Sequence, residues 1–212
     1  MTKGKKSLDD FCRQFEGGEN TGPKIVPYTF DDVVAAMQEI APYDWRTFFT
    51  ERVNSHGPGA PLGGLENSGW KLVYSETPNE SREAGEIAMH LTDVQFSLGF
   101  LVRDTGGENG DEVIDVIPGS PAALAGIAPG MKLLAVNGRR WSPDDLHAAI
   151  RQAKSGGEPI QLLIENEDFF QTYKVDYRGG ERYPHLERIT GKPDVLGDIA
   201  KMKAPPVAAA KD

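Results

Sequence analysis

The stretch Ser97-Leu98-Gly99-Phe100, followed by Leu101-Val102-Arg103, decides the fold that we predict for this chain. Glycine tolerates the backbone angles of a tight turn, so Gly99 is expected to direct the amide hydrogens of residues 98–100 toward one point. Such a cluster of amides binds a carboxylate without a cationic side chain. The residues after it are predicted to form a strand with an open edge, which would accept an extended peptide through main-chain hydrogen bonds.

A helix predicted from Pro143 to about Lys154, with Ser142 as its N-cap residue, supplies the opposite wall of this groove. Its apolar residues recur at the spacing of one helical face. Side chains from the strand and the helix are expected to line an apolar pocket for the last residue of a peptide. His147 is interpreted as an ordinary surface histidine. The predicted peptide-binding residues are Ser97, Leu98, Gly99, Phe100, Leu101, Val102, Leu146, Ala149, Ile150 and Ala153.

Further motifs follow in a fixed order. The run Pro118-Gly119-Ser120-Pro121-Ala122-Ala123-Leu124-Ala125-Gly126 predicts a short helix closed by a left-handed glycine, and Asn137-Gly138 predicts a tight turn. Together with Ser97-Leu98-Gly99-Phe100, they resemble the bacterial, protease-associated type of PDZ domain over about residues 93–177. The resemblance implies a small, partly open β-barrel with two helices that binds peptide or protein C-termini. A glycine-kinked strand, or a PDZ-like spacer with an empty groove, is the alternative.

The chain is predicted to be α+β, with a short all-helical N-terminal segment followed by the PDZ domain. Ser7, Thr29 and Asp44 each precede an amphipathic stretch and are expected to cap three helices. We divide the chain into a helical part with its linker (1–80), a PDZ domain with flanking strands (81–190) and a partly disordered tail (191–212). Strands are expected at residues 70–74, 87–91, 99–102, 113–117, 132–136, 160–165 and 172–177.

Composition narrows the classes of partner. Lysine and arginine number 23 against 32 aspartate and glutamate residues, a formal charge of −9. This charge disfavours nucleic acid as a partner, because phosphate binding needs a basic surface. No apolar stretch approaches the roughly 20 residues of a membrane-spanning helix. Cys12 is the single cysteine and is expected to be a small buried hydrophobe. The compartment, cytoplasmic or periplasmic, is left open.

A second resemblance covers about residues 4–200. It is to the C-terminal part of the glycyl aminopeptidase family of zinc metallopeptidases, whose members join a thermolysin-like catalytic domain to a PDZ domain. The resemblance implies that residues 1–80 are the last helices of a catalytic region, which would be a partner within the same protein. It rests on Ser7-Leu8-Asp9-Asp10-Phe11, on residues 26–33, on Pro42-Tyr43-Asp44-Trp45, on Pro61-Leu62-Gly63-Gly64-Leu65 and on residues 177–188.

The chain departs from that family at the catalytic motif. Family activity requires the H-E-x-x-H pair of zinc-binding histidines, but His56, His90, His147 and His185 are dispersed and none has this context. We therefore predict no catalytic residue, no metal ligand and no cofactor in this chain, with zinc expected in the full-length parent. The alternatives are a free-standing PDZ adaptor or scaffold unrelated to proteolysis, and a hydrolase with an unfamiliar site.

Two quantitative expectations follow from the predicted groove. Peptide affinity is expected to be about micromolar, or about −8 kcal/mol, because one carboxylate cradle and one pocket must offset the ordering of the peptide. Replacement of Gly99 by a β-branched residue is expected to abolish binding with little unfolding.

Overall fold

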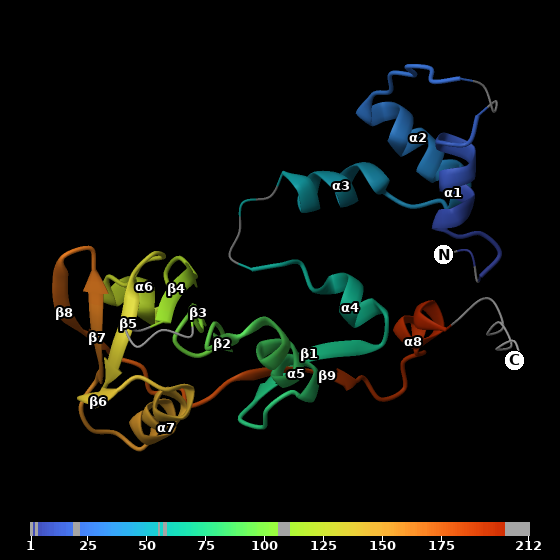
Figure 1. Cartoon of the computed structure of the whole chain (residues 1–212). Helices are drawn as coiled ribbons and strands as arrows, with labels where there is room; N and C mark the ends of the chain where they lie inside the picture. Colours follow the sequence, from blue (N-terminus) through green and yellow to red (C-terminus); the bar gives the residue numbers. More distant parts are fainter. Residues whose placement is uncertain are drawn as a thin grey trace, which may run out of the picture. The chain divides into compact units, whose positions relative to one another are not determined.

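The computed structural model describes residues 2, 4–18, 22–54, 56, 59–105 and 111–201 of the chain. These residues form two compact units, residues 1–61 and residues 62–212, which are considered separately (Figure 1). Residues 202–212, which are half of the tail that was expected to be partly disordered, lie outside the described residues.

The first unit consists of three helices, α1 (Leu8–Phe15), α2 (Phe30–Ile40) and α3 (Trp45–Val53). Each begins directly after the residue that the sequence predicts as its cap. The side chains of Ser7, Thr29 and Asp44 accept hydrogen bonds from amides of the first turn, which satisfies donors that lack a partner within the helix. The predicted all-helical character of this region is therefore confirmed as far as residue 61.

The small core of the first unit is aromatic. Trp45 is buried, its indole Nε1 donates to the carbonyl oxygen of Ala41 at 2.7 Å, and its ring lies against Phe48 and Phe49. Much of the remaining apolar surface is exposed. Ile25 is 94% exposed, and a hollow of about 360 Å³ opens between α2 and α3.

Cys12 corrects one prediction. It lies in α1, but its side chain is exposed. The apolar side of α1 is instead formed by Phe11 and Phe15, whose rings stack at 5.2 Å. Cys12 was expected to be buried because the periodicity of an eight-residue helix defines its inner face only within about one residue.

The second unit combines a seven-stranded antiparallel sheet with a separate two-stranded ribbon. The sheet has the order β2-β3-β4-β5-β7-β8, and β6 also pairs with β5. The helices and strands of the second unit are α4 (Gly63–Asn67), β1 (Trp70–Ser75), α5 (Glu80–Met89), β2 (Leu91–Asp93), β3 (Phe100–Arg103), β4 (Asp111–Val116), α6 (Pro121–Ala125), β5 (Lys132–Val136), β6 (Arg139–Arg140), α7 (Pro143–Lys154), β7 (Ile160–Asn166), β8 (Phe169–Val175), β9 (Tyr183–Arg188) and α8 (Val195–Ala200).

The two helices of the sheet domain have the bounds that their caps predict. Ser120 and Ser142 accept hydrogen bonds from the amides of Ala123 and Asp145, and a proline opens each helix. Gly126 ends α6 at φ +95°, a left-handed conformation that glycine adopts without strain.

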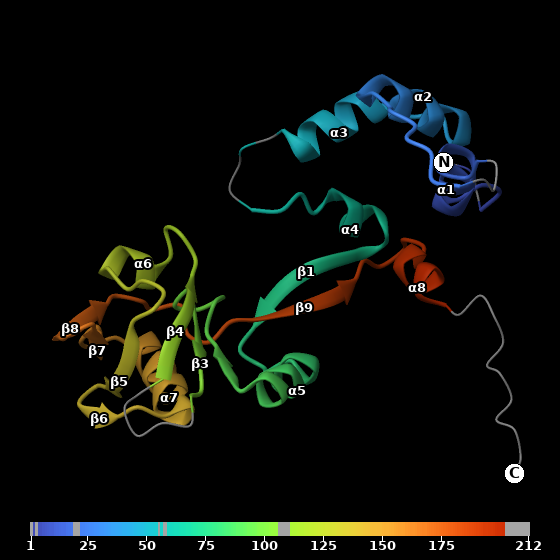
Figure 2. The same ribbon diagram turned by 45° about the horizontal axis from the view of Figure 1, so that its top comes forward.

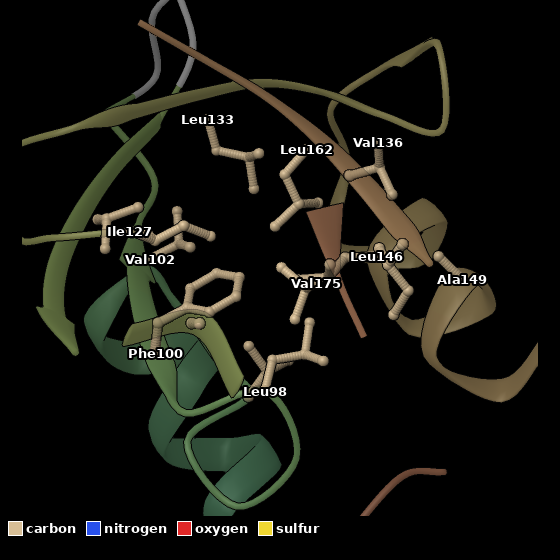
Figure 3. Packing of buried hydrophobic residues seen from close by; sticks show 14 of the residues in the cluster. Leu98, Phe100, Val102, Ile127, Leu133, Val136, Leu146, Ala149, Leu162 and Val175 are labelled. Atoms are coloured by element: carbon tan, nitrogen blue, oxygen red, sulfur yellow. The ribbon is translucent and has the colours of Figure 1, made fainter. Parts of the chain in front are cut away.

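The core of the second unit lies between the sheet and α7. Inward-facing side chains of β3, β4, β5, β7 and β8 form one buried cluster with those of α7, and Figure 3 shows Leu98, Phe100, Leu146 and Val175 converging there. At the far edge of the sheet, β8 is mostly exposed, and its first two residues, Phe169 and Phe170, are large exposed apolar side chains.

One predicted strand is wrong. Residues 87–91 were expected to form a strand, but α5 continues through Met89, and the strand β2 begins only at Leu91. The side chain of Asn79 caps α5 by accepting from the amides of Ser81 and Arg82, and His90 ends it in a left-handed conformation at φ +53°. The run Ile87–Leu91 was apolar enough to resemble a strand, although Ile87 and Met89 are exposed.

The ribbon joins two distant parts of the chain. β1 pairs with β9 antiparallel from Trp70 opposite Arg188 to Ser75 opposite Tyr183 (Figure 2). The strand at β1 was predicted, whereas β9 was not. The predicted domain boundary at residue 80 stays a prediction. β1 lies before this boundary, among the residues assigned to the helical part, and pairs with β9, which follows the seven-stranded sheet.

None of the helices in the described ranges is long and apolar enough to cross a membrane.

Candidate functional site

The strand that was expected to receive a peptide is β3. Its two neighbours in the sheet are β4 on one side and β2 on the other. The pairing with β2 is antiparallel, with Leu91 opposite Arg103, Thr92 opposite Val102 and Asp93 opposite Leu101. The prediction that β3 has an open edge is therefore wrong in this structure, because the preceding segment of the same chain occupies it.

Backbone amides of the turn around Gly99 also have an acceptor within the chain. The amides of Ser97 and Gly99 both donate to the carbonyl oxygen of Val94, at 3.1 and 2.9 Å, and the amide of Val94 donates to the carbonyl oxygen of Phe100 at 3.2 Å. The sequence correctly placed Gly99 at a turn, at φ +93°. Of the three amides of residues 98–100 that were expected to converge on an external carboxylate, that of Gly99 donates instead to a carbonyl group of the chain itself. The convergence of all three on a bound carboxylate stays a prediction.

The predicted site residues do come together, but as core. Most of them are buried, and only Leu101 is half-buried. Figure 3 shows Leu98 and Phe100 facing the same interior as Leu146 and Ala149 of α7. The spacing of apolar positions on α7 identified its inner face correctly. The assignment of these residues to peptide binding stays a prediction, and the pocket expected between them is filled by their own side chains.

An open cleft of about 580 Å³ lies beside this core. Its walls are α5 and α7, and residues of β2 and of the segment that leads into β9 contribute to its lining. Glu86 and His147 face it from the two helices, while Leu91 and Tyr183 come from the strands. The cleft thus borders the outer side of β2, the strand at the end of the sheet.

Glu181 organises one end of the cleft. Its side chain is 7% exposed, and Oε1 lies 2.8 Å from Nδ1 of His147 and 3.0 Å from Nη1 of Arg151. Removal of a carboxylate from water is unfavourable unless cationic or hydrogen-bonding partners replace the solvent. His147 is therefore not the ordinary surface histidine that was predicted. Glu181 was missed as a site residue, although it lies in the Tyr177–Arg188 stretch that carries the second resemblance.

Two more groups at the cleft have shifted acidities. Burial raises the pKa of Glu86, against the opposing charges of His147 and Arg82. Burial, with a further contribution from the carboxylates of Glu181 and Glu86, raises the pKa of Tyr183 to about 12. The phenol of Tyr183 is therefore a neutral group throughout the physiological range of pH.

The shift of Tyr183 predicts a loss of stability in alkali. The unfolded chain releases this proton near pH 10, whereas the folded chain holds it to about 12, so the free energy of unfolding falls as the pH rises from about 10 to about 12. Urea unfolding across this range measures the effect. Tyr183→Phe is the control and should show a shallower decline. An equal decline in both proteins would contradict the assignment.

Metal ligands are not grouped in the part of the chain that the structure describes. No set of three or more His, Cys, Asp or Glu side chains in those residues is placed to hold a metal ion. The paired carboxylates of the N-terminal unit serve its helices instead. Asp10 and Asp32 accept hydrogen bonds from the amides of Ser7 and Thr29, as in capping boxes.

Comparison with known proteins identifies the sheet domain. Residues 112–166 match a family model described as a PDZ domain. This part of the chain is a PDZ domain. The matched region runs from β4 to the end of β7 and includes α6 and α7. The predicted fold class, an α+β chain with an N-terminal helical segment and a PDZ domain, is confirmed.

A solved structure was also found to be similar to this chain. It is the HtrA3 PDZ domain bound to a phage-derived ligand with the sequence FGRWV, at 14% sequence identity and a TM-score of 0.27. The match covers 63% of this chain and 99% of the HtrA3 PDZ chain. PDZ domains are peptide-binding modules.

Proposed function

We propose that this chain is the peptide-binding PDZ portion of a larger zinc-dependent aminopeptidase and is not itself catalytic. The PDZ domain supports peptide binding, and the sequence resemblance on both sides of the domain supports the aminopeptidase parent. On this proposal, the upstream catalytic domain of the same protein is the partner of the helical unit.

The observation that carries the link to a larger protein is the apolar surface of the helical unit. Ile25 is 94% exposed, Val53 76%, Val26 69% and Tyr28 66%. Three short helices provide no second layer to cover such side chains, and large exposed apolar surfaces mark sites of interaction. A catalytic domain that ends in these helices would bury them.

The non-catalytic part of the proposal rests on chemistry. Zinc peptidases of the H-E-x-x-H type hold the metal with two histidines one helical turn apart, and a glutamate activates the bound water. His56, His90, His147 and His185 are too far apart in sequence for this arrangement. In the described residues His147 and His185 have other partners, Glu181 and the carbonyl oxygen of Thr77.

Three measurements on the purified chain test the proposal. We expect no stoichiometric zinc by elemental analysis, no release of amino acids from aminoacyl peptides, and selection of C-terminal sequences from a peptide library with a randomised free C-terminus. Selected peptides should bind with a dissociation constant of about micromolar. A library of the same composition with amidated C-termini is the matched control.

The outcomes separate the competing functions. Bound zinc together with peptide hydrolysis would overturn the non-catalytic assignment and favour a hydrolase with an unfamiliar site. The gene that encodes this chain should also encode an H-E-x-x-H helix in the same reading frame. Its absence from that gene would favour the free-standing PDZ adaptor, provided that peptides are selected. Failure to select any peptide would refute the binding role.

A further inference from the structure

The strand β2 lies where an extended peptide would add to the PDZ domain. A peptide that binds a sheet edge forms main-chain hydrogen bonds with the outermost strand. β2 forms such bonds with β3 and runs antiparallel to it, from Leu91 opposite Arg103 to Asp93 opposite Leu101. The chain then reaches the turn around Gly99 at Val94, so β2 approaches this turn with its C-terminal end.

Val94 occupies the position that the C-terminal residue of a bound peptide would take. Its carbonyl oxygen accepts two hydrogen bonds, from the amides of Ser97 and Gly99. Paired backbone amides of this kind are the donors that an oxygen of a terminal carboxylate would use. A carbonyl group in the middle of the chain here takes the place of that carboxylate.

The side chains of the segment are buried in the same way. Thr92 is 6% exposed and Val94 is 3% exposed, and Val94 belongs to the core that includes Leu98 and Phe100. Leu91 and Asp93, which alternate with them, are only half-buried. The segment therefore places small β-branched side chains in the domain at two positions separated by one residue.

We propose that residues 91–94 are a resident ligand of the PDZ domain, and that external peptides bind by displacing them. This inference rests on the proposed peptide-binding function and specifies its partner. The partner is an extended peptide with a free C-terminus that presents a small β-branched residue at its end and another two positions earlier, as Thr92 and Val94 do. Peptide binding and release of β2 are then one event.

The pairing of β2 is limited enough to be exchanged. β2 pairs with β3 over three residues, whereas β7 and β8 pair over seven. The helix that leads into β2 ends at His90 with φ +53°, a left-handed conformation that is unfavourable for a non-glycine residue. Rotation at His90 would relieve this conformation and carry β2 away from β3.

Helix α5 holds β2 in place. Arg82 forms an ion pair with the carboxylate of Asp93, and Oε1 of Glu86 accepts the amide hydrogen of Asp93 at 2.6 Å. The guanidinium of Arg82 also lies 4.9 Å from the ring centroid of Phe96, in the turn that follows. These contacts stabilise the position of residues 91–94 from their outer side. Their loss should therefore favour binding of the external peptide.

A reversible covalent lock tests the displacement directly. Leu91 and Arg103 face each other at a pair that does not exchange backbone hydrogen bonds, since the flanking bonds join residues 90 with 104 and 94 with 100. The Cα atoms of such pairs lie about 4.5 Å apart, within the range of a disulfide. The test protein is L91C/R103C with Cys12→Ser, which leaves no third thiol.

The probe is a heptapeptide with the sequence of residues 88–94, Ala-Met-His-Leu-Thr-Asp-Val, with a free carboxylate. The same peptide with an amidated C-terminus is its control. We expect the oxidised protein to bind the probe about a hundredfold more weakly than the same protein after reduction, because the competent state is no longer populated. Urea unfolding of both forms confirms that each is folded.

A complementary variant weakens the contacts of α5 with β2. Arg82→Met removes the ion pair with Asp93 and should strengthen binding of the probe about tenfold, a common size for coupling within a protein. Lys132→Met is the matched control, because it removes a 2.9 Å ion pair with Glu165 elsewhere in the same sheet and should leave the affinity unchanged. Hydrogen exchange gives a second readout, since the amides of Thr92 and Val94 should lose protection when the probe binds.

The results distinguish this inference from the function on which it rests. Equal affinity in the oxidised and reduced forms, with Thr92 and Val94 still protected, would overturn the resident ligand and leave peptide binding intact at another surface, such as the cleft between α5 and α7. No binding of the probe to any variant, while the randomised library selects other peptides, would overturn the specificity that we infer from residues 91–94. No binding of the probe or of any library peptide would overturn both proposals.

Discussion

Gly99→Ala should destabilise the PDZ domain by about 3 kcal/mol or more. A Cβ atom at this position would lie 2.0 Å from Cβ and 2.3 Å from Oγ of Ser120, and Gly99 also has φ +93°. A left-handed conformation costs alanine about 1–2 kcal/mol, and overpacking adds about 1–3 kcal/mol. Ser120 cannot move away freely, because its side chain caps α6. Urea unfolding of the variant measures the loss.

Two control variants separate the causes. Gly119→Ala has a similar φ of +76° but open space around the new Cβ, so it should cost only the conformational part, about 1–2 kcal/mol. Addition of Ser120→Gly to Gly99→Ala should recover part of the loss, because it removes the clashing atoms. Equal stability of Gly99→Ala and Gly119→Ala would contradict the contact with Ser120.

This expectation corrects the one drawn from the sequence, in which a β-branched residue at Gly99 abolishes peptide binding with little unfolding. The sequence indicated why Gly99 must turn the chain. It did not indicate that the turn packs against the start of α6, 21 residues later, where the hydroxyl of Ser120 also lies 3.4 Å from the carbonyl oxygen of Gly99. A binding defect in a Gly99 variant is therefore interpretable only with its stability in hand.

The second large effect is expected at Phe100. Its ring is 1% exposed and packs among the side chains of the sheet and α7, so Phe100→Ala should cost about 3–5 kcal/mol of unfolding free energy through lost burial and the cavity left behind. Phe169→Ala, at a side chain that is 73% exposed, is the matched control and should change stability by less than about 0.5 kcal/mol.

The pair also tests where the groove is. If Phe100→Ala abolished peptide binding but changed stability by less than about 1 kcal/mol, the ring would line an open pocket and the packing described above would be incorrect. A large loss of stability with peptide affinity retained at low temperature would instead assign Phe100 to the core alone.

Elements whose limits are set locally were predictable from the sequence. The limits of α6 and α7 match the prediction because a capping serine and a proline mark each start, and β5 matches because it is an apolar run between turns. The inner face of α7 was also predictable, since Leu146 and Ile150 recur at helical spacing.

What occupies the edge of β3 was not predictable in this way. Strand pairing depends on which segments meet in space, and the segment that pairs with β3 is only Leu91–Asp93, between a helix and a turn. The apolar residues Ile87 and Met89 favoured a strand at residues 87–91, where the structure has the end of α5. Asn79, a good helix cap, was the signal in the sequence for this helix. The contact of Glu181 with His147 joins residues 34 positions apart and has no local signal in the sequence.

The ribbon of β1 and β9 has a consequence for how the polypeptide is threaded. Ser75 and Tyr183 are paired neighbours, so the segment from residue 76 to residue 182, which contains the seven-stranded sheet, begins and ends at adjacent points. This segment is therefore an insertion between the two strands of the ribbon. A short linker could replace the insertion while Ser75 and Tyr183 stay next to each other. A stretching force applied to the two chain termini would act on the ribbon before it acted on the inserted segment.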